Sequence, residues 1–153
     1  MPMNFSDTVP AAPGGGVNVK WQVDGDNNLS AYLDSASLPS TGPYDVVASY
    51  VGKPGAAALV LVLTYTRAVS FAANFSGSRG ILSANPAAAA TYTVKKNGTG
   101  IGTVAVSTGG VFTFATSGGA AQSFAAGDRM TVEAPSPADT TLADVGLTFA
   151  GTR

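Results

Sequence analysis

Residues 91–106 constrain the fold more than any other stretch, because their local chemistry nearly specifies a β-hairpin. The run reads T-Y-T-V-K-K-N-G-T-G-I-G-T-V-A-V. Apolar and polar residues alternate with a period of two on both sides of the Asn97-Gly98 pair, which is the pattern of a strand with one buried face. Asn-Gly readily adopts the positive φ angles of a tight hairpin turn. We therefore predict two antiparallel strands joined by this turn.

Short strand-like runs separated by turn residues fill the rest of the chain after Gly42. No helix of useful length is indicated, and residues 74–90, rich in Ser, Gly, Asn and Ala, are predicted to form a loop. Together with the hairpin these runs give about eight strands at short spacing, which is typical of an all-β sandwich or jelly roll. The further predicted strands are residues 44–51, 56–71, 111–116, 122–125, 129–134 and 142–150.

Residues 56–71 are predicted to form one long strand. The first half of this run is continuously apolar, as expected for a strand that is covered on both faces, and the second half alternates. A helix over residues 56–63 is the competing interpretation. The β-branched residues Val60, Val62 and Thr64 argue against that helix.

The segment before Gly42 has a different character. Residues 1–16 contain three prolines and the triple glycine 14–16, with Phe5 and Val9 as their only large apolar residues besides methionine, so we expect an extended arm. Residues 17–23 and 29–33 follow as a small hairpin that carries Trp21 and Tyr32.

Residues 34–43 have the composition of a linker, which places a domain boundary near Gly42. We therefore expect an arm, an attachment hairpin and a linker over residues 1–42, and one β-domain over residues 43–153.

Charge and composition exclude several classes of function. The chain has 153 residues, of which 45% are hydrophobic and only 11% charged, and its net charge is −1. No basic stripe is available for nucleic acid, and the longest apolar run, residues 56–63, is far shorter than the roughly 20 residues that span a bilayer. A surface this poor in charge favours a chain packed against copies of itself or a larger assembly.

The residues needed for common catalytic chemistry are missing. The chain has no Cys and no His, which removes disulfides, thiolate sites, Ser-His triads and imidazole ligands. A glycosidase could still use paired carboxylates, and the candidates are Asp128, Glu133, Asp139 and Asp144. Because no apolar pocket is indicated around them and the acidic loop 139–144 is expected to be solvated, we assign no catalytic residue and no cofactor, and we expect a protein that is not an enzyme.

One stretch has the opening spacing of a calcium-binding loop. Asp24, Asp26 and Asn28 alternate, but Leu29 stands where such a loop needs Gly, and Ser35 stands where it needs a bidentate Glu. We therefore predict a plain polar turn and no metal site.

Aromatic residues on the predicted strands could in principle form a platform for sugars. Core or interface positions are the more common place for them. The residues concerned are Trp21, Tyr32, Tyr44, Tyr50, Tyr65 and Tyr92.

Two groups of motifs resemble structural proteins of tailed bacteriophages. Residues 4–13, 17–22 and 29–32 (N-F-S-D-T-V-P-A-A-P, V-N-V-K-W-Q and L-S-A-Y) are similar to the attachment segment of such proteins. The β-domain of such proteins is similar to residues 77–79, 94–99, 124–132, 134–135 and 142–153.

This resemblance implies a virion protein, assembled in the cytoplasm of the bacterial host, that decorates the capsid or forms a short fibre as a homotrimer. Phe5, Val9, Trp21 and Tyr32 are then the expected contacts to partner subunits of the capsid or tail. The alternative is a tail-associated receptor-binding module that recognises host surface polysaccharide through residues 76–85 or 136–141.

Overall fold

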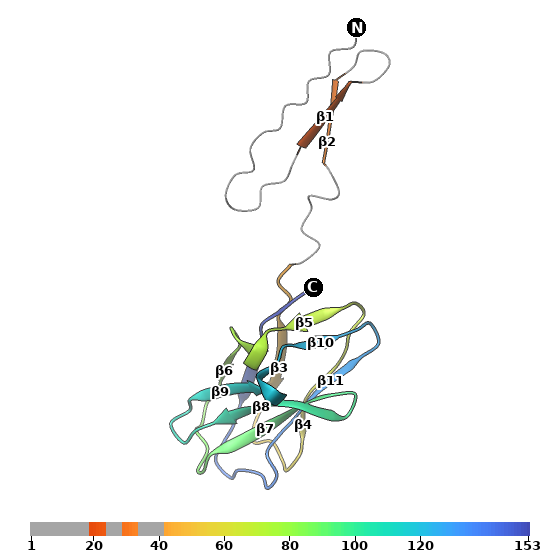
Figure 1. Cartoon of the computed structure of the whole chain (residues 1–153). Coiled ribbons are helices and arrows are strands. Elements are labelled where there is room, and N and C mark those ends of the chain that lie inside the picture. Colours follow the sequence, from red (N-terminus) through yellow and green to blue (C-terminus); the bar gives the residue numbers. More distant parts are fainter. Residues whose placement is uncertain (1–18, 24–28, 34–41) are drawn as a thin grey trace. The chain divides into compact units, whose positions relative to one another are not determined.

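The computed structural model describes residues 42–153 in full and the backbone of residues 19–23 and 29–33 (Figure 1). Contacts within the chain divide it into two units, Met1–Ser40 and Thr41–Arg153. In the first unit, β1 (Val19–Val23) and β2 (Leu29–Leu33) pair as an antiparallel hairpin. Trp21 stands opposite Ala31 and Tyr32 stands opposite Lys20 in this register.

The second unit is all-β, as predicted, and its strands pair antiparallel throughout. They form a five-stranded sheet in the order β4-β11-β7-β8-β9 and two three-stranded sheets, β3-β12-β6 and β10-β5-β13. Two short 3₁₀ helices, η2 (Ala73–Phe75) and η3 (Ser117–Gly119), interrupt the strands. The strands are β3 (Val46–Tyr50), β4 (Leu59–Thr64), β5 (Val69–Phe71), β6 (Arg79–Ile81), β7 (Ala90–Lys96), β8 (Thr99–Val106), β9 (Phe112–Thr116), β10 (Gln122–Phe124), β11 (Arg129–Glu133), β12 (Val145–Phe149) and β13 (Gly151–Thr152).

The predicted central hairpin is confirmed as β7 and β8, with one irregularity. Asn97 and Gly98 form the turn with φ angles of 50° and 88°, as a tight hairpin turn requires. The expectation of strict alternation in β8 is wrong, because the pairing register skips one residue. Val94 pairs with Gly102, whereas the next residue, Lys95, pairs with Gly100. Ile101 is the extra residue of this β-bulge, and the bulge lets Ile101 be buried on the same strand as Val104.

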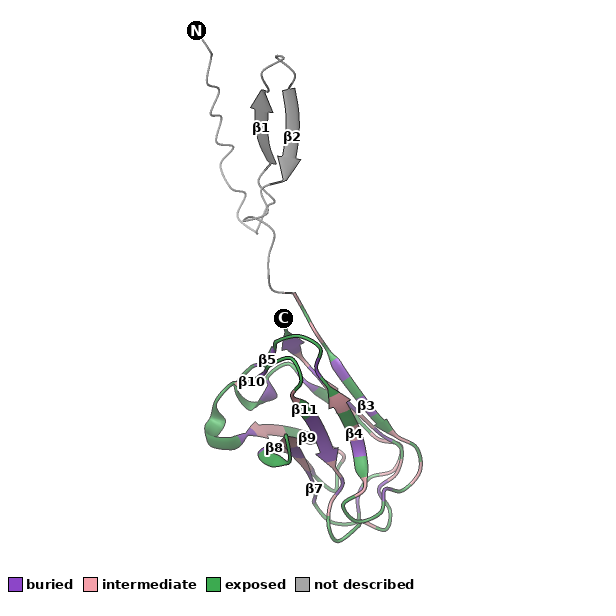
Figure 2. Cartoon of the chain, turned by 90° about the vertical axis from the view of Figure 1, so that its right-hand side faces the viewer, coloured by how far each residue is buried: buried purple, intermediate pink, exposed green. Residues whose placement is uncertain are grey.

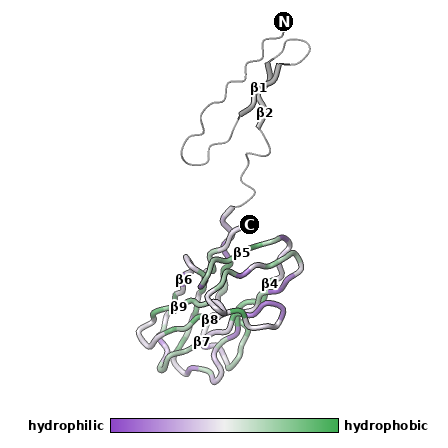
Figure 3. Tube along the Cα trace, viewed as in Figure 1, coloured by the Kyte–Doolittle hydropathy of each residue, from purple (hydrophilic) through white to green (hydrophobic). Residues whose placement is uncertain are grey.

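All three sheets of the second unit contribute residues to one hydrophobic core. Figure 2 marks the buried residues of this unit in purple. Aromatic rings form its centre: the Tyr65 and Phe124 centroids lie 4.6 Å apart, and Phe75 meets Phe149 edge-on at 5.3 Å. Ring pairs of this kind add attraction beyond their buried area. Strongly hydrophilic segments are few outside the turns (Figure 3), in keeping with the low content of charged residues.

The prediction of one long strand over residues 56–71 is wrong. The run divides into β4 and β5, which belong to different sheets. Tyr65 lies between the two strands and is only 1% exposed. Its backbone forms hydrogen bonds with Gly127 and Asp128 of the turn before β11. The expectation that both faces of the first half are covered is also wrong, because β4 is an edge strand and Val62 is 57% exposed.

Residues 74–90 contain a strand that the sequence did not reveal. β6 pairs with β12, but it has only three residues and its centre is Gly80, which usually signals a turn. Gly80 is required here for packing, because a Cβ atom at this position would lie 2.3 Å from the ring of Phe112. Because β6 has this glycine at its centre, its sequence resembles that of a loop.

The ends of the second unit are joined to each other. The amide of Gly42 donates to the carbonyl of Arg153 at 2.7 Å, and the amide of Arg153 donates back to Gly42 at 2.9 Å. Pro43 forms an isolated bridge with Thr152. Residues 42 and 43, which look like linker in the sequence, are thus fixed to the C-terminal strand.

We predict that Gly102→Ala destabilises the domain by about 2 kcal/mol, since a Cβ atom there would lie 2.4 Å from the Ala115 carbonyl oxygen and 2.7 Å from the Phe75 ring. Gly100→Ala is the matched control on the same strand, because its added Cβ meets nothing within 4 Å. Urea denaturation of both variants measures the difference. Equal stability of the two variants would contradict the packing described here.

Candidate functional site

The carboxylates considered for catalysis lie in separate places and are engaged in holding the fold. Asp128 belongs to the turn before β11, Glu133 ends β11, and Asp139 and Asp144 lie in the segment between β11 and β12. Glu133 forms an ion pair with Lys95 of the neighbouring strand at 2.6 Å. Each of the other three accepts several hydrogen bonds.

Asp128 links two turns that are far apart in the sequence. Its carboxylate accepts the amide of Ala125 at 2.7 Å and the side-chain amide of Asn97 at 2.7 Å, and it pairs with Lys96 at 3.0 Å. The Asn97 side-chain carbonyl in turn accepts the Arg129 amide at 2.8 Å. We call Lys96, Asn97, Asp128 and Arg129 the turn junction.

The pKa of Asp128 is lowered to about 2, chiefly by the hydrogen bond from the Ala125 amide and then by Asn97 and Lys96 of the turn junction. A carboxyl group with so low a pKa stays ionised near neutral pH. It cannot act as the proton donor that a glycosidase needs, because that role requires a raised pKa.

Asp139 ties its own loop to the segment before β7. One carboxylate oxygen accepts the amides of Thr141 and Leu142, both at 2.8 Å, and the other accepts the amides of Ala87 at 3.0 Å and Ala88 at 3.3 Å. These bonds, led by those from Leu142 and Thr141, hold the pKa of Asp139 well below its ordinary value.

Asp144 is held in the same way. It accepts the Ser83 hydroxyl and the Gly52 amide, each at 2.6 Å, and both bonds lower its pKa. The loop that carries Asp139 and Asp144 was expected to be simply solvated. Its carboxylates are accessible to solvent, but their hydrogen bonds show that they serve as structural acceptors.

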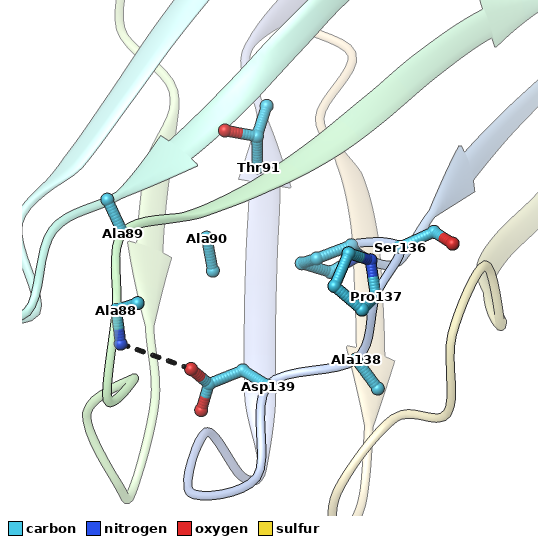
Figure 4. A pocket seen from close by; sticks show the side chains of 9 residues that line it. Ala88, Ala89, Ala90, Thr91, Ser136, Pro137, Ala138 and Asp139 are labelled. Carbon is cyan, nitrogen blue, oxygen red and sulfur yellow. Dashed lines mark hydrogen bonds between the residues drawn. The ribbon is translucent and has the colours of Figure 1, made fainter.

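The two segments considered for sugar binding come together. The Thr141 hydroxyl donates to the Asn85 carbonyl at 2.9 Å, and Ala84 forms a bridge with Ala143. Beside them lies a hollow of about 320 Å³ lined by residues 88–91 and 135–139. Figure 4 shows that Ala and Pro side chains make up most of its wall and that Asp139 points toward the Ala88 amide. Among the described residues, no aromatic ring lines the hollow.

The tyrosines of the second unit support the prediction of core positions. Tyr65 and Tyr92 are 1% and 0% exposed, and Tyr44 and Tyr50 pack against the core with partial burial. The Tyr92 hydroxyl has no hydrogen-bond partner within the described part of the chain. Burial, with a smaller effect from the negative charge of Asp139, raises the pKa of Tyr92 to about 12.

The remaining predicted site residues fall outside what the structure describes. Phe5, Val9 and residues 24–28, which have the opening spacing of a calcium-binding loop, lie outside the described residues. Trp21 and Tyr32 lie on β1 and β2, of which only the backbone is described. Within residues 42–153, no three acidic side chains gather closely enough to hold a metal ion.

The sequence analysis missed one surface, the outer face of the β3-β12-β6 sheet. Val47, Val51 and Ile81 are 67%, 89% and 72% exposed there. The signal was present in the run V-V-A-S-Y-V at residues 46–51, since a strand with apolar residues on both faces exposes one set wherever only one face meets the core.

The described residues contain no helix long and apolar enough to cross a membrane. Comparisons of this chain with protein-family models, with curated proteins and with solved structures give no match. Function is therefore inferred from the chain's own residues.

We predict that acid weakens the turn junction. The folded pKa of Asp128 lies below its ordinary value of 3.8, so its contribution to stability is complete above about pH 4 and is lost as the pH falls toward 2. Asp128→Asn should lower the melting temperature at pH 7 and reduce the further loss between pH 4 and pH 2. Thermal melts of the two proteins across this pH range measure both effects. A variant with the wild-type melting temperature and the wild-type acid dependence would show that the junction does not stabilise the fold.

Proposed function

We propose that this chain is a non-enzymatic structural component of a bacteriophage particle, a capsid decoration or short fibre protein that attaches through its N-terminal segment and assembles as a homotrimer. The observation that carries the proposal is the use of the carboxylates: Asp128, Glu133, Asp139 and Asp144 all bind the chain's own amides, hydroxyls or lysines. A domain whose acidic groups are occupied in this way is suited to being a rigid building block.

For residues 43–153 we propose a β-sandwich of jelly-roll type. The five-stranded sheet and the β3-β12-β6 sheet both supply residues to one core, for example Val132 from β11 and Leu147 from β12. Two antiparallel sheets that share a core in this way are the basis of a sandwich. The β10-β5-β13 sheet adds Phe71 and Phe124 to the same core.

The mechanism of attachment is burial of apolar surface on capsid or tail subunits. The pairs Val19–Leu33, Trp21–Ala31 and Val23–Leu29 of the β1-β2 ladder consist of apolar residues only. A two-stranded hairpin alone is marginally stable in water, and alternate pairs of a ladder share one face. A hairpin with such pairs gains stability when a partner covers them, and Phe5 and Val9 of the arm add further apolar contacts.

We predict that deletion of residues 1–33 leaves a folded β-domain that no longer joins particles. Deletion of residues 1–16 is the matched control: it removes the arm but keeps the hairpin, so it should reduce particle association by less. Co-sedimentation of each variant with virions gives the occupancy, and circular dichroism confirms the fold. Full occupancy by the longer deletion would refute attachment through this segment.

The alternative function is recognition of host surface polysaccharide at the tail. It is favoured by the contact between Asn85 and Thr141 and by the hollow next to it. If this alternative is correct, the chain binds the polysaccharide of its host, and Ala89→Arg, which fills the hollow, abolishes that binding. Wild-type protein that shows no binding in calorimetry would retire the alternative.

A further inference from the structure

The outer face of the β3-β12-β6 sheet is a registered surface of small and aliphatic residues. Val47, Thr148 and Arg79 form one row across the three strands, and Ser49, Gly146 and Ile81 form the next. Asp45 and Val51 continue the exposed alternation of β3 at its two ends. We call this surface, made of these eight residues, the β12 face.

The β12 face concentrates the apolar exposure of the domain. Six large hydrophobic residues are exposed in the described part of the chain, and three of them, Val47, Val51 and Ile81, lie on this face. Scattered exposed aliphatic residues are ordinary, but a cluster of them marks a surface that binds another protein. The question is which protein covers the cluster.

The arrangement of large and small residues on the face suits a second copy of itself. Its aliphatic residues lie on the two outer strands, whereas the middle strand presents Gly146 and Thr148. A Cβ atom added to Gly146 would lie 3.1 Å from Cγ2 of Ile81, so the Ile81 side chain already lies against the glycine. A two-fold axis parallel to β12 places β6 of one copy over β3 of the other. Ile81 then lies above Ser49, between Val47 and Val51 of the second copy.

The charges of the face are also self-complementary. Asp45 lies on the β3 side and Arg79 on the β6 side, and neither forms an ion pair in the part of the chain that the structure describes. Arg79 donates only to the carbonyl of its neighbour Ser78 there. The same two-fold axis brings Arg79 of each copy next to Val47 and Asp45 of the other, so the opposite charges meet twice. Opposite charges across an interface select the correct partner and orientation.

We propose that the β12 face binds the β12 face of a second copy of this chain, forming an isologous dimer in which Ile81 packs between Val47 and Val51 and Arg79 pairs with Asp45. The contact spans only three strands and is smaller than a standard interface, so the dimer forms with a dissociation constant on the order of 10 μM. Many copies on one surface raise the local concentration and make a contact of this strength effective.

The proposal does not depend on the phage function. Where the chain forms no trimer, loss of the β12 contact lowers the molar mass from two chains to one. Where the chain forms the proposed trimer, the β12 contact joins trimers to one another, and its loss returns the molar mass to three chains.

Charge reversal in the full-length chain tests the proposal. Asp45→Arg and Arg79→Asp each place like charges opposite one another, and each should weaken association about tenfold. The double variant, with both changes, restores opposite charges and should recover the wild-type mass. Val111→Glu is the matched control, because Val111 is 64% exposed but lies outside the face. Sedimentation velocity from about 1 μM to about 1 mM measures the mass of every variant.

Recovery by the double variant, with Val111→Glu unchanged, supports the dimer. Three results overturn it: a wild-type mass that does not rise with concentration, single variants that associate like the wild type, or a double variant that stays at the mass of the single variants. Rescue by the second reversal separates a lost contact from a misfolded variant. The mass of the smallest species, three chains or one chain, reports separately whether the proposed trimer exists.

Discussion

The turn junction is the interaction on which the arrangement of the five-stranded sheet depends. It joins the hairpin turn at Asn97 to the turn before β11 through the Asp128 carboxylate. β11 lies between β4 and β7, so fixing its start relative to the hairpin sets the register on both sides of it. Tyr65 bonds to the same turn through its backbone while its side chain enters the aromatic core. One partly buried carboxylate thus connects strand order to core packing, since β11, whose start it fixes, carries Met130 and Val132 into the interior.

The same use of acidic groups connects the fold to the proposed function. Asp139 and Asp144 hold the segments around β6 and β12 as Asp128 holds the turns. Carboxylates that are fixed by amide donors have low pKa values and are poor proton donors. The surface also carries aliphatic residues on the β12 face and a hollow walled mainly by Ala and Pro. These features fit the proposed role in association between proteins.

Local signals predicted those parts of the structure that depend on neighbouring residues. The Asn-Gly pair and its alternating flanks specified β7 and β8, and the expected core or interface positions are confirmed as core positions for Tyr65 and Tyr92. Pairings between distant segments were not predictable in this way. The division of residues 56–71 depends on where Tyr65 meets the turn at Asp128, and β6 depends on the fit of Phe112 against Gly80. Both are tertiary contacts, which produce no periodic pattern in the sequence.

The candidate site was harder to predict than the fold, for a related reason. The sequence identifies Asp128, Asp139 and Asp144 as acidic but cannot show which amides they accept. It also shows that Val47 and Val51 are apolar, but not that β3 has only one covered face. Quantitative mass spectrometry of purified particles is the most direct test of the proposed role. The account predicts this chain at a fixed ratio to the major capsid protein, in multiples of three per attachment point. Particles that lack the chain, or carry it only in variable traces, would contradict the account.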